Sequence, residues 1–130
     1  MANKIKAIGA YRPRIKLGKT VQMEEFVEYI STRTGLNEGE INNVFHEARD
    51  GIVFFNLMGR AVKLEGLGTF TPKIGLDGIL DVAHRVARRL KKRLNSGTFR
   101  GEIINRDMIG KTSDELVTRW NEEHPDDPVE

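Results

Sequence analysis

The sequence predicts an α+β fold in which two helices form a body beneath a small antiparallel sheet. Apolar residues recur with helical spacing over 21–34 and again over 41–58. The segment 62–70 alternates as a strand does and carries two glycines where the chain reverses. A chain of 130 residues, 38% hydrophobic and 31% charged, is long enough for one soluble domain with a modest core.

Residues 1–19 form a basic extension that we expect to contain an edge strand. Apolar and cationic residues alternate over 11–17, as they do in a half-exposed strand. Pro13 suits an edge, because it cannot donate a hydrogen bond to a neighbouring strand. The cations of this alternation are Arg12, Arg14 and Lys16.

Two helices are expected next. Thr20 can cap the first, whose apolar stripe consists of Met23, Phe26, Val27 and Ile30. Gly35 supplies its C-terminal stop, and Asn37 with Glu40 forms a capping pair for the second helix.

The second helix, Ile41 to Met58, carries more apolar surface than one small domain can cover. Its C-terminal half is apolar nearly all round. We therefore expect a partner chain to pack on it, and the alternative cover is the chain's own C-terminal extension. The residues expected at the interface between chains are Phe45, Ile52, Phe54, Phe55 and Met58.

A hairpin and a basic helix complete the predicted elements. Asp77-Gly78 predicts a tight reversal between a strand over 69–74 and a second strand over 79–85. From Ala83, apolar residues fall on one helical stripe, while six cations between Arg85 and Arg93 occupy the remaining positions. These cations repel one another, which favours an anionic ligand over a merely soluble surface.

Charge is strongly segregated along the chain, although the net charge is only +2. Residues 1–20 carry +6, residues 21–59 carry −5, residues 60–75 carry +2, residues 76–101 carry +5 and residues 102–130 carry −6. Basic blocks separated by acidic ones indicate one face that binds a polyanion and another that is solvated. The alternative is that both basic blocks serve only solubility.

Taken together, the chain resembles the bacterial histone-like family of HU and integration host factor. The resemblance covers Thr20 to Ile74 and rests on the helix, Gly35-Leu36, the long apolar helix and the pattern Val62-x-Leu64-x-Gly66-x-Gly68-x-Phe70. It implies an intertwined dimer that binds DNA. The family's long arm with an Arg-Asn-Pro tip is missing, since the chain turns back at Asp77-Gly78, so the intercalating proline is not carried over.

The resemblance implies a domain over residues 20–95, flanked by the 1–19 extension and by a 96–130 extension. In the latter, Thr112 to Glu115 reads as a capping box for a helix in which Trp120 anchors packing. The acidic end is expected to fray, or else to fold over the basic helix and compete with DNA.

We thus expect a non-enzymatic homodimer that binds double-stranded DNA through phosphates, largely without sequence preference. It would act as a nucleoid-associated, histone-like protein of the cytoplasm. The alternative is a protein-interaction module, or a structural protein of a phage or mobile element, that keeps the fold without DNA binding. The expected DNA contacts are Lys73, Arg85, Arg88, Arg89, Lys92 and Arg93, extended by Arg12, Arg14 and Lys16.

Other functions find little support in the sequence. There is no cysteine, and the three histidines lack metal-ligand spacing. Gly66-Leu67-Gly68 lacks the third glycine of a nucleotide-binding loop. No apolar run approaches the roughly 20 residues that span a bilayer, and we see no secretory signal. We expect no cofactor, metal, membrane or small-molecule substrate.

Overall fold

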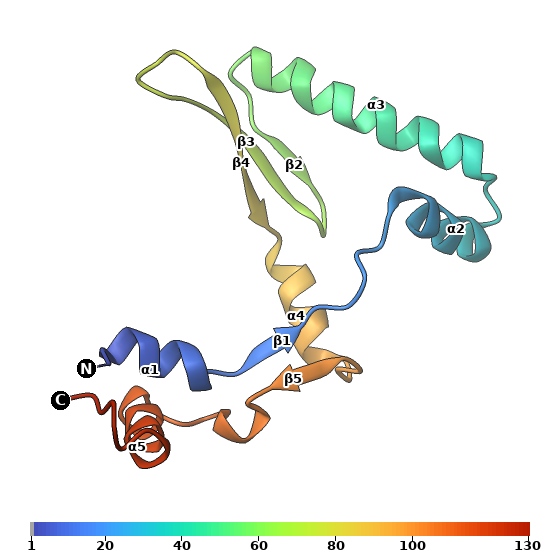
Figure 1. The fold of residues 1–130 in the computed structure, drawn as a ribbon. Coiled ribbons are helices and arrows are strands. Elements are labelled where there is room, and N and C mark those ends of the chain that lie inside the picture. Colours follow the sequence, from blue (N-terminus) through green and yellow to red (C-terminus); the bar gives the residue numbers. More distant parts are fainter. Residues whose placement is uncertain (1) are drawn as a thin grey trace. The chain divides into compact units, whose positions relative to one another are not determined.

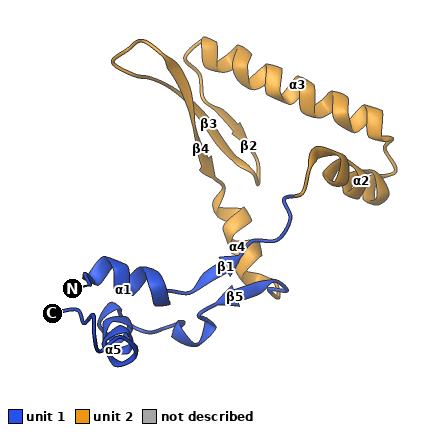
Figure 2. Ribbon diagram, in the orientation of Figure 1, with its two compact units in different colours: residues 1–20, 99–130 blue, residues 21–98 orange. Residues whose placement is uncertain are grey.

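The computed structural model describes residues 2–130, and the chain divides into two compact units (Figure 2). Unit 1 combines the two ends of the chain, Met1–Thr20 and Phe99–Glu130. Unit 2 is the intervening segment Val21–Thr98. The two terminal extensions inferred from the sequence thus contribute to one unit, and unit 2 is inserted into it along the chain. The α+β fold class is confirmed (Figure 1).

Unit 2 begins with a helix pair, α2 (Met23–Thr34) and α3 (Glu38–Leu57). The predicted stop at Gly35 is confirmed, because this glycine adopts the left-handed conformation at φ 77°. The cap at Asn37 is also confirmed, since its side chain accepts a hydrogen bond of 2.8 Å from the Glu40 backbone N–H. The cap at Thr20 is wrong: Gln22 occupies the N-cap position and makes no side-chain capping bond.

A three-stranded antiparallel sheet follows, with the order β2 (Val62–Leu64), β3 (Gly68–Ile74) and β4 (Leu80–Val86). The turn between β2 and β3 is closed by a 3.0 Å bond from the Leu67 N–H to the Leu64 carbonyl. Gly66 in this turn has φ 78°, a left-handed conformation that glycine adopts without a steric penalty. The hairpin predicted from the glycine pattern is therefore confirmed.

Gly68 is required because β4 passes close to it. A Cβ atom at this position would lie 2.4 Å from the Arg85 carbonyl oxygen and 2.6 Å from Nε2 of His84. Backbone cannot yield as a flexible side chain can, so any larger residue here forces the strands apart.

We expect Gly68→Ala to lower the free energy of unfolding of unit 2 by about 1–3 kcal/mol, the usual range for overpacking. Thermal melting followed by circular dichroism measures the effect. The control is Gly9→Ala, at a helical position where a Cβ would meet nothing within 4 Å. This control should stabilise its helix by about 0.5–1 kcal/mol. Equal melting of Gly68→Ala and the wild type would contradict the steric argument.

The predicted reversal at Asp77-Gly78 is confirmed, and it is held by local hydrogen bonds. The Gly75 N–H donates to the Ile79 carbonyl at 3.1 Å, and the Gly78 N–H donates to the Gly75 carbonyl at 3.0 Å. Gly78 has φ 80°, which suits a type I turn followed by a left-handed residue. Leu76 is fully exposed in this loop.

The basic helix α4 (Arg88–Ser96) starts five residues later than the sequence suggested. Ala83 and Arg85 belong to β4, which confirms the strand predicted over 79–85, and they pair with Thr71 and Thr69. The apolar spacing from Ala83 to Ala87 fits a helix locally, but the ladder to β3 satisfies the backbone of these residues. Ala87 is the N-cap residue of α4.

Unit 2 has little core of its own. Within residues 21–98, all of which the structure describes, Val27 and Ile41 are the only buried apolar side chains. Of the five residues expected at an interface between chains, Phe45 and Ile52 are half-buried, and the Phe45 ring lies 5.8 Å from that of Phe26. The other three, Phe54, Phe55 and Met58, are exposed.

Unit 1 is built from both ends of the chain. It contains α1 (Lys4–Tyr11), β1 (Arg14–Lys16), β5 (Glu102–Ile104), the short 3₁₀ helix η1 (Arg106–Met108) and α5 (Ser113–Glu123), with β1 antiparallel to β5. The expected N-terminal strand is confirmed only for 14–16, because Tyr11 ends a helix. The core consists of Ala2, Ala7, Tyr11, Leu116 and Trp120.

The C-terminal helix and its tail are held firmly within unit 1. The predicted cap is confirmed, since Thr112 accepts a bond from the Glu115 N–H, and Trp120 is buried as the expected anchor. The Trp120 indole N–H donates to the Asp127 carbonyl at 2.7 Å, and the Val129 N–H donates to the Asn121 side chain at 2.6 Å. The expected fraying is therefore wrong. These tail bonds are made inside unit 1 and lend no support to a tail that covers the basic helix.

One hydrogen-bonded cluster joins α1 to α5. The Tyr11 hydroxyl donates to the Glu123 carboxylate, and Arg119 donates to Glu123 at 3.1 Å and to Asp107 at 2.8 Å. The bonds from Tyr11 and then Arg119 lower the pKa of Glu123. The same bond to Glu123, followed by desolvation, raises the pKa of Tyr11.

We expect unit 1 to lose stability at both pH extremes. The contribution of Glu123 is present above about pH 4.3, the ordinary glutamate value, and is lost as pH falls through the lowered pKa. The contribution of Tyr11 is full below about pH 10 and is lost as pH rises through its raised pKa. Urea unfolding at a series of pH values measures the loss of stability at both the acid and the alkaline end. It is followed by the fluorescence of Trp120, the chain's one tryptophan.

Tyr11→Phe should remove the alkaline loss and weaken the acid loss. The matched control is Tyr29→Phe, whose exposed ring lies on α2 of the other unit. An unchanged profile in Tyr11→Phe would show that the cluster does not set the pH dependence.

Candidate nucleic-acid interface

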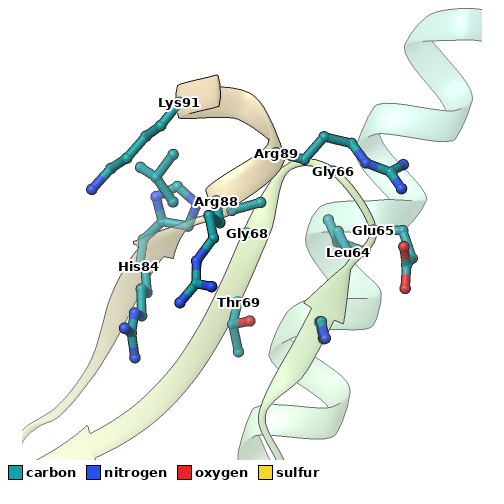
Figure 3. A pocket seen from close by; sticks show the side chains of 13 residues that line it. Leu64, Glu65, Gly66, Gly68, Thr69, His84, Arg88, Arg89 and Lys91 are labelled. Carbon is teal, nitrogen blue, oxygen red and sulfur yellow. The ribbon is translucent and has the colours of Figure 1, made fainter. Parts of the chain in front are cut away.

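A basic hollow of about 750 Å³ lies where the hairpin meets α4 (Figure 3). It is lined by the end of β2, the following turn, the start of β3, the end of β4 and the first turn of α4. His84, Arg88 and Lys91 lie on one side in this view, and Arg89 points to the other side, over the Gly66 turn. We refer to this feature as the basic hollow.

Backbone pairing fixes the walls of the basic hollow. The Ala87 N–H donates to the Leu67 carbonyl at 3.0 Å, which ties the start of α4 to the β2–β3 turn. The register aligns Lys63, Thr69 and Arg85 in one row across the three strands. Directly paired residues share a face of a sheet, so Lys63 and Arg85 present their charges on the same side.

The cations at this junction are not neutralised by the chain itself. Among residues 2–130, no carboxylate forms an ion pair within 4.0 Å with any cation of the group Arg85, Arg88, Arg89, Lys91, Lys92 and Arg93. The first turn of α4 contains no acidic residue and its N-cap makes no side-chain bond. Arg88 and Arg89 thus sit at the positive end of the helix dipole, where an anion is favoured.

The predicted DNA contacts fall into three groups. Arg85, Arg88 and Arg89 line the basic hollow. Arg93 lines a second hollow beside the same turn, which it shares with Arg89, and Lys92 is exposed on α4. Lys73 lies farther along the hairpin and pairs with Asp81 at 3.6 Å, so its charge is partly compensated.

The N-terminal cations belong to unit 1, so their continuity with the basic hollow stays a prediction. Arg12 follows α1 directly as its C-cap residue, and Arg14 lies on β1. Lys16 on the same strand pairs with Glu102 of β5 at 3.6 Å, which offsets its charge.

The expected DNA contacts omit three residues that line the basic hollow, namely Lys63, His84 and Lys91, although Lys91 is one of the six cations predicted for the basic helix. Lys63 could have been found from the hairpin register, since a short turn over 64–67 places it opposite Thr69 and in line with Arg85. Lys91 follows once α4 is started at Arg88, because it then lies one turn beyond Ala87. His84 had no signal beyond its place in β4.

No helix within the described residues 2–130 is long and apolar enough to cross a membrane. No group of three or more histidine, aspartate or glutamate side chains among them is arranged to hold a metal ion.

The path of the chain through unit 2 is that of an HU-like domain, in which a helix pair leads into a small antiparallel sheet whose hairpin runs on into a basic helix. Comparison with protein families specifies the family: residues 3–110 match the one described as "HU domain fused to wHTH, Ig, or Glycine-rich motif", and the chain belongs to it. The match covers unit 2 and also α1, β1, β5 and η1 of unit 1, and it ends before α5. No curated protein matches the chain.

Proposed function

We propose that the protein is a non-enzymatic, architectural binder of double-stranded DNA that contacts phosphates through the basic hollow and α4. The observation that carries the proposal is the group of six cations on β4 and α4 that have no acidic partner within residues 2–130. Leaving so many like charges together costs stability unless an anion neutralises them. A duplex supplies closely spaced phosphates, and the family of the chain makes DNA the natural polyanion.

Binding of this kind carries little sequence preference. Arg and Lys that contact phosphates position a protein on the duplex, whereas bases are read by groups that enter a groove. Helix α4 is only 9 residues long, and three of its cations, Arg88, Arg89 and Lys91, line the basic hollow. We propose that the protein acts in this way as a nucleoid-associated, histone-like protein of the cytoplasm.

We further propose that the functional form is a homodimer joined through α3. Unit 2 buries only Val27 and Ile41 among its apolar side chains, although it comprises residues 21–98. Phe54 on α3 is 60% exposed, and Phe55 and Met58 beside it are also exposed. A contiguous apolar surface of this kind marks an interface, and a second copy offers the same helix as cover.

The salt dependence of duplex binding tests the phosphate proposal. If roughly 6–10 phosphates are neutralised per dimer, affinity should fall by about 10³–10⁵ between about 50 mM and 200 mM salt. Fluorescence anisotropy with a labelled duplex of random sequence measures this. An affinity that hardly changes with salt would refute contact through phosphates.

The second candidate is an interaction or structural module that keeps the fold without binding DNA. Its support is the short hairpin, whose loop over 75–79 exposes Leu76 and Ile79, together with the Lys73–Asp81 pair that reduces the basic charge there. Absence of any duplex binding at low salt would favour it.

A further inference from the structure

The tip of the β3–β4 hairpin carries a cluster of exposed aliphatic side chains. Leu76 is fully exposed, and the exposed fractions of three neighbours lie between 61% and 67%, namely those of Ile74, Ile79 and Leu80. The loop that presents them is held in shape, because the Asp77 carboxylate accepts a 3.0 Å bond from the Ile79 N–H in addition to the backbone bonds that close the turn. We refer to the four aliphatic residues, together with Asp77, as the apolar tip.

A second exposed apolar surface lies in the hollow beside α4. This second hollow has a volume of about 660 Å³. It is lined by three exposed leucines, Leu67, Leu90 and Leu94. Its charged lining residues are Arg89, Arg93 and Glu65, which together carry +1. A phosphate alone cannot cover aliphatic side chains, so a ligand that fits this hollow supplies apolar surface as well as negative charge.

The apolar tip has both of these properties. Its aliphatic side chains are uncovered, and Asp77 gives it a charge of −1. Within residues 2–130, Asp77 forms no ion pair within 4.0 Å, whereas Asp81 farther down the hairpin is offset by Lys73. Opposite charges beside two apolar surfaces favour contact between them and oppose contact between like surfaces.

One chain cannot bring its apolar tip to its own second hollow. The register pairs Gly68 with Val86 at the end of the hairpin next to α4, and Ile74 with Leu80 at the other end (Figure 1). At a rise of about 3.4 Å per residue, these two ends lie roughly 20 Å apart. The strand ladder keeps the hairpin extended, so a tip that enters the hollow comes from a second copy.

We propose that the apolar tip of one copy docks in the second hollow of another copy, so that the molecules assemble head to tail. The contact needs no DNA and is distinct from the symmetric α3 interface. Because two different surfaces meet, each copy keeps a tip or a hollow for a further copy, and repetition gives rings or open chains. Arg85, Arg88 and Lys91 line the basic hollow and not the second one, so they remain open to phosphates.

The test is the average mass of the full chain without DNA, measured by sedimentation between about 10 μM and 1 mM. Wild type should form species larger than a dimer, and their share should rise with concentration. Leu76→Gln and Leu94→Gln change the tip and the hollow without changing the net charge. Each should weaken the association by about 10–100-fold, the effect expected when burial of one leucine is lost.

An equal mixture of the two variants gives the sharpest comparison. Leu76→Gln retains the wild-type hollow, and Leu94→Gln retains the wild-type tip. The mixture should therefore regain the association that neither variant shows alone. Leu17→Gln is the matched control, because Leu17 is an exposed leucine of unit 1, and it should assemble as the wild type does.

Three results would overturn the head-to-tail contact. The first is a wild type with no species larger than a dimer at about 1 mM. The second is a mixture that associates no further than either variant alone. The third is a Leu76→Gln variant that dissociates the dimer itself, which would assign the tip to the symmetric interface. Circular dichroism separates these results from loss of folding. Duplex affinity tests the proposed function separately, since Leu17, Leu76 and Leu94 do not line the basic hollow.

Discussion

Replacing Arg88 and Arg89 together by glutamate is expected to lower duplex affinity by at least about 10²-fold at low salt. Both residues lie in the first turn of α4, line the basic hollow and have no acidic partner within residues 2–130. A hydrogen bond to a charged group contributes about 1.5–3 kcal/mol, so losing two reaches this size before repulsion by the new carboxylates is counted. Gel shift or anisotropy with random-sequence duplex measures the change.

The salt dependence of the same variant sharpens the result. Each lost phosphate contact should reduce the slope of log affinity against log salt by about 1, so the double variant, which loses two contacts in each chain of the dimer, should show a shallower slope by about 4. A protein that loses affinity through misfolding gives no such graded change.

The matched control is Arg33→Glu with Arg49→Glu, which changes the net charge by the same amount on α2 and α3. Arg33 lies over the Tyr29 ring, and Arg49 pairs with its neighbour Asp50, so neither lines the basic hollow. Its affinity should drop only by the modest factor that long-range charge imposes. Equal losses in the two double variants would mean that net charge, and not the hollow, governs binding.

Phe54→Ala is expected to weaken dimer association by at least about 10²-fold. In one chain the Phe54 ring is 60% exposed, so its removal should cost that chain little. If a second chain buries the ring, truncation costs about 3–5 kcal/mol, as for a core phenylalanine, and the symmetric interface loses it twice. Sedimentation equilibrium of the full chain measures the association constant.

Leu17→Ala provides the control for this prediction, because Leu17 is 87% exposed and lies in unit 1. Its association constant should match that of the wild type. A wild-type protein that sediments as a monomer at micromolar concentration, with unit 2 fully folded, would contradict the α3 interface.

The sequence predicted most of unit 2 because its signals are local. Gly35, Gly66 and Gly78 all adopt positive φ, so each marks a turn that few other residues could make. The capping bond of Asn37 depends only on the next three residues. Such positions can be recognised without knowing what packs against them.

The sequence failed where long-range contacts decide the structure. Helix α1 is short, contains Gly9 and buries only Ala7 and Tyr11. These two side chains pack against α5, which lies more than 100 residues away in the sequence. The helical pattern of α1 is therefore too weak to detect alone. Residues 83–85 fall both in the predicted strand over 79–85 and in the helical stripe from Ala83, and pairing with β3 makes them a strand.

The residues of the candidate site likewise divide into those predicted from local signals and those placed by pairing between strands. Clustered cations on α4 were visible in the sequence, since they are close along the chain. Lys63 joins them only through the register of β2 with β3 and of β3 with β4. Conversely, the sequence alone does not show that Lys73 and Lys16 have cross-strand carboxylate partners, Asp81 and Glu102, which partly compensate their charges.

The insertion of unit 2 within unit 1 bears on how the protein matures during synthesis. Lys4 of α1 bonds to Asp114 of α5, so this contact must wait until about 110 further residues have been translated. Helices α2 and α3 and the hairpin, in contrast, form from neighbouring residues and emerge first. The newly made chain consequently exposes the apolar side of α3 and an unpaired α1 at the same time. Slow translation between residues 58 and 113 would prolong the time for which these apolar surfaces are exposed. A chaperone that binds them during this time would protect the chain from aggregation.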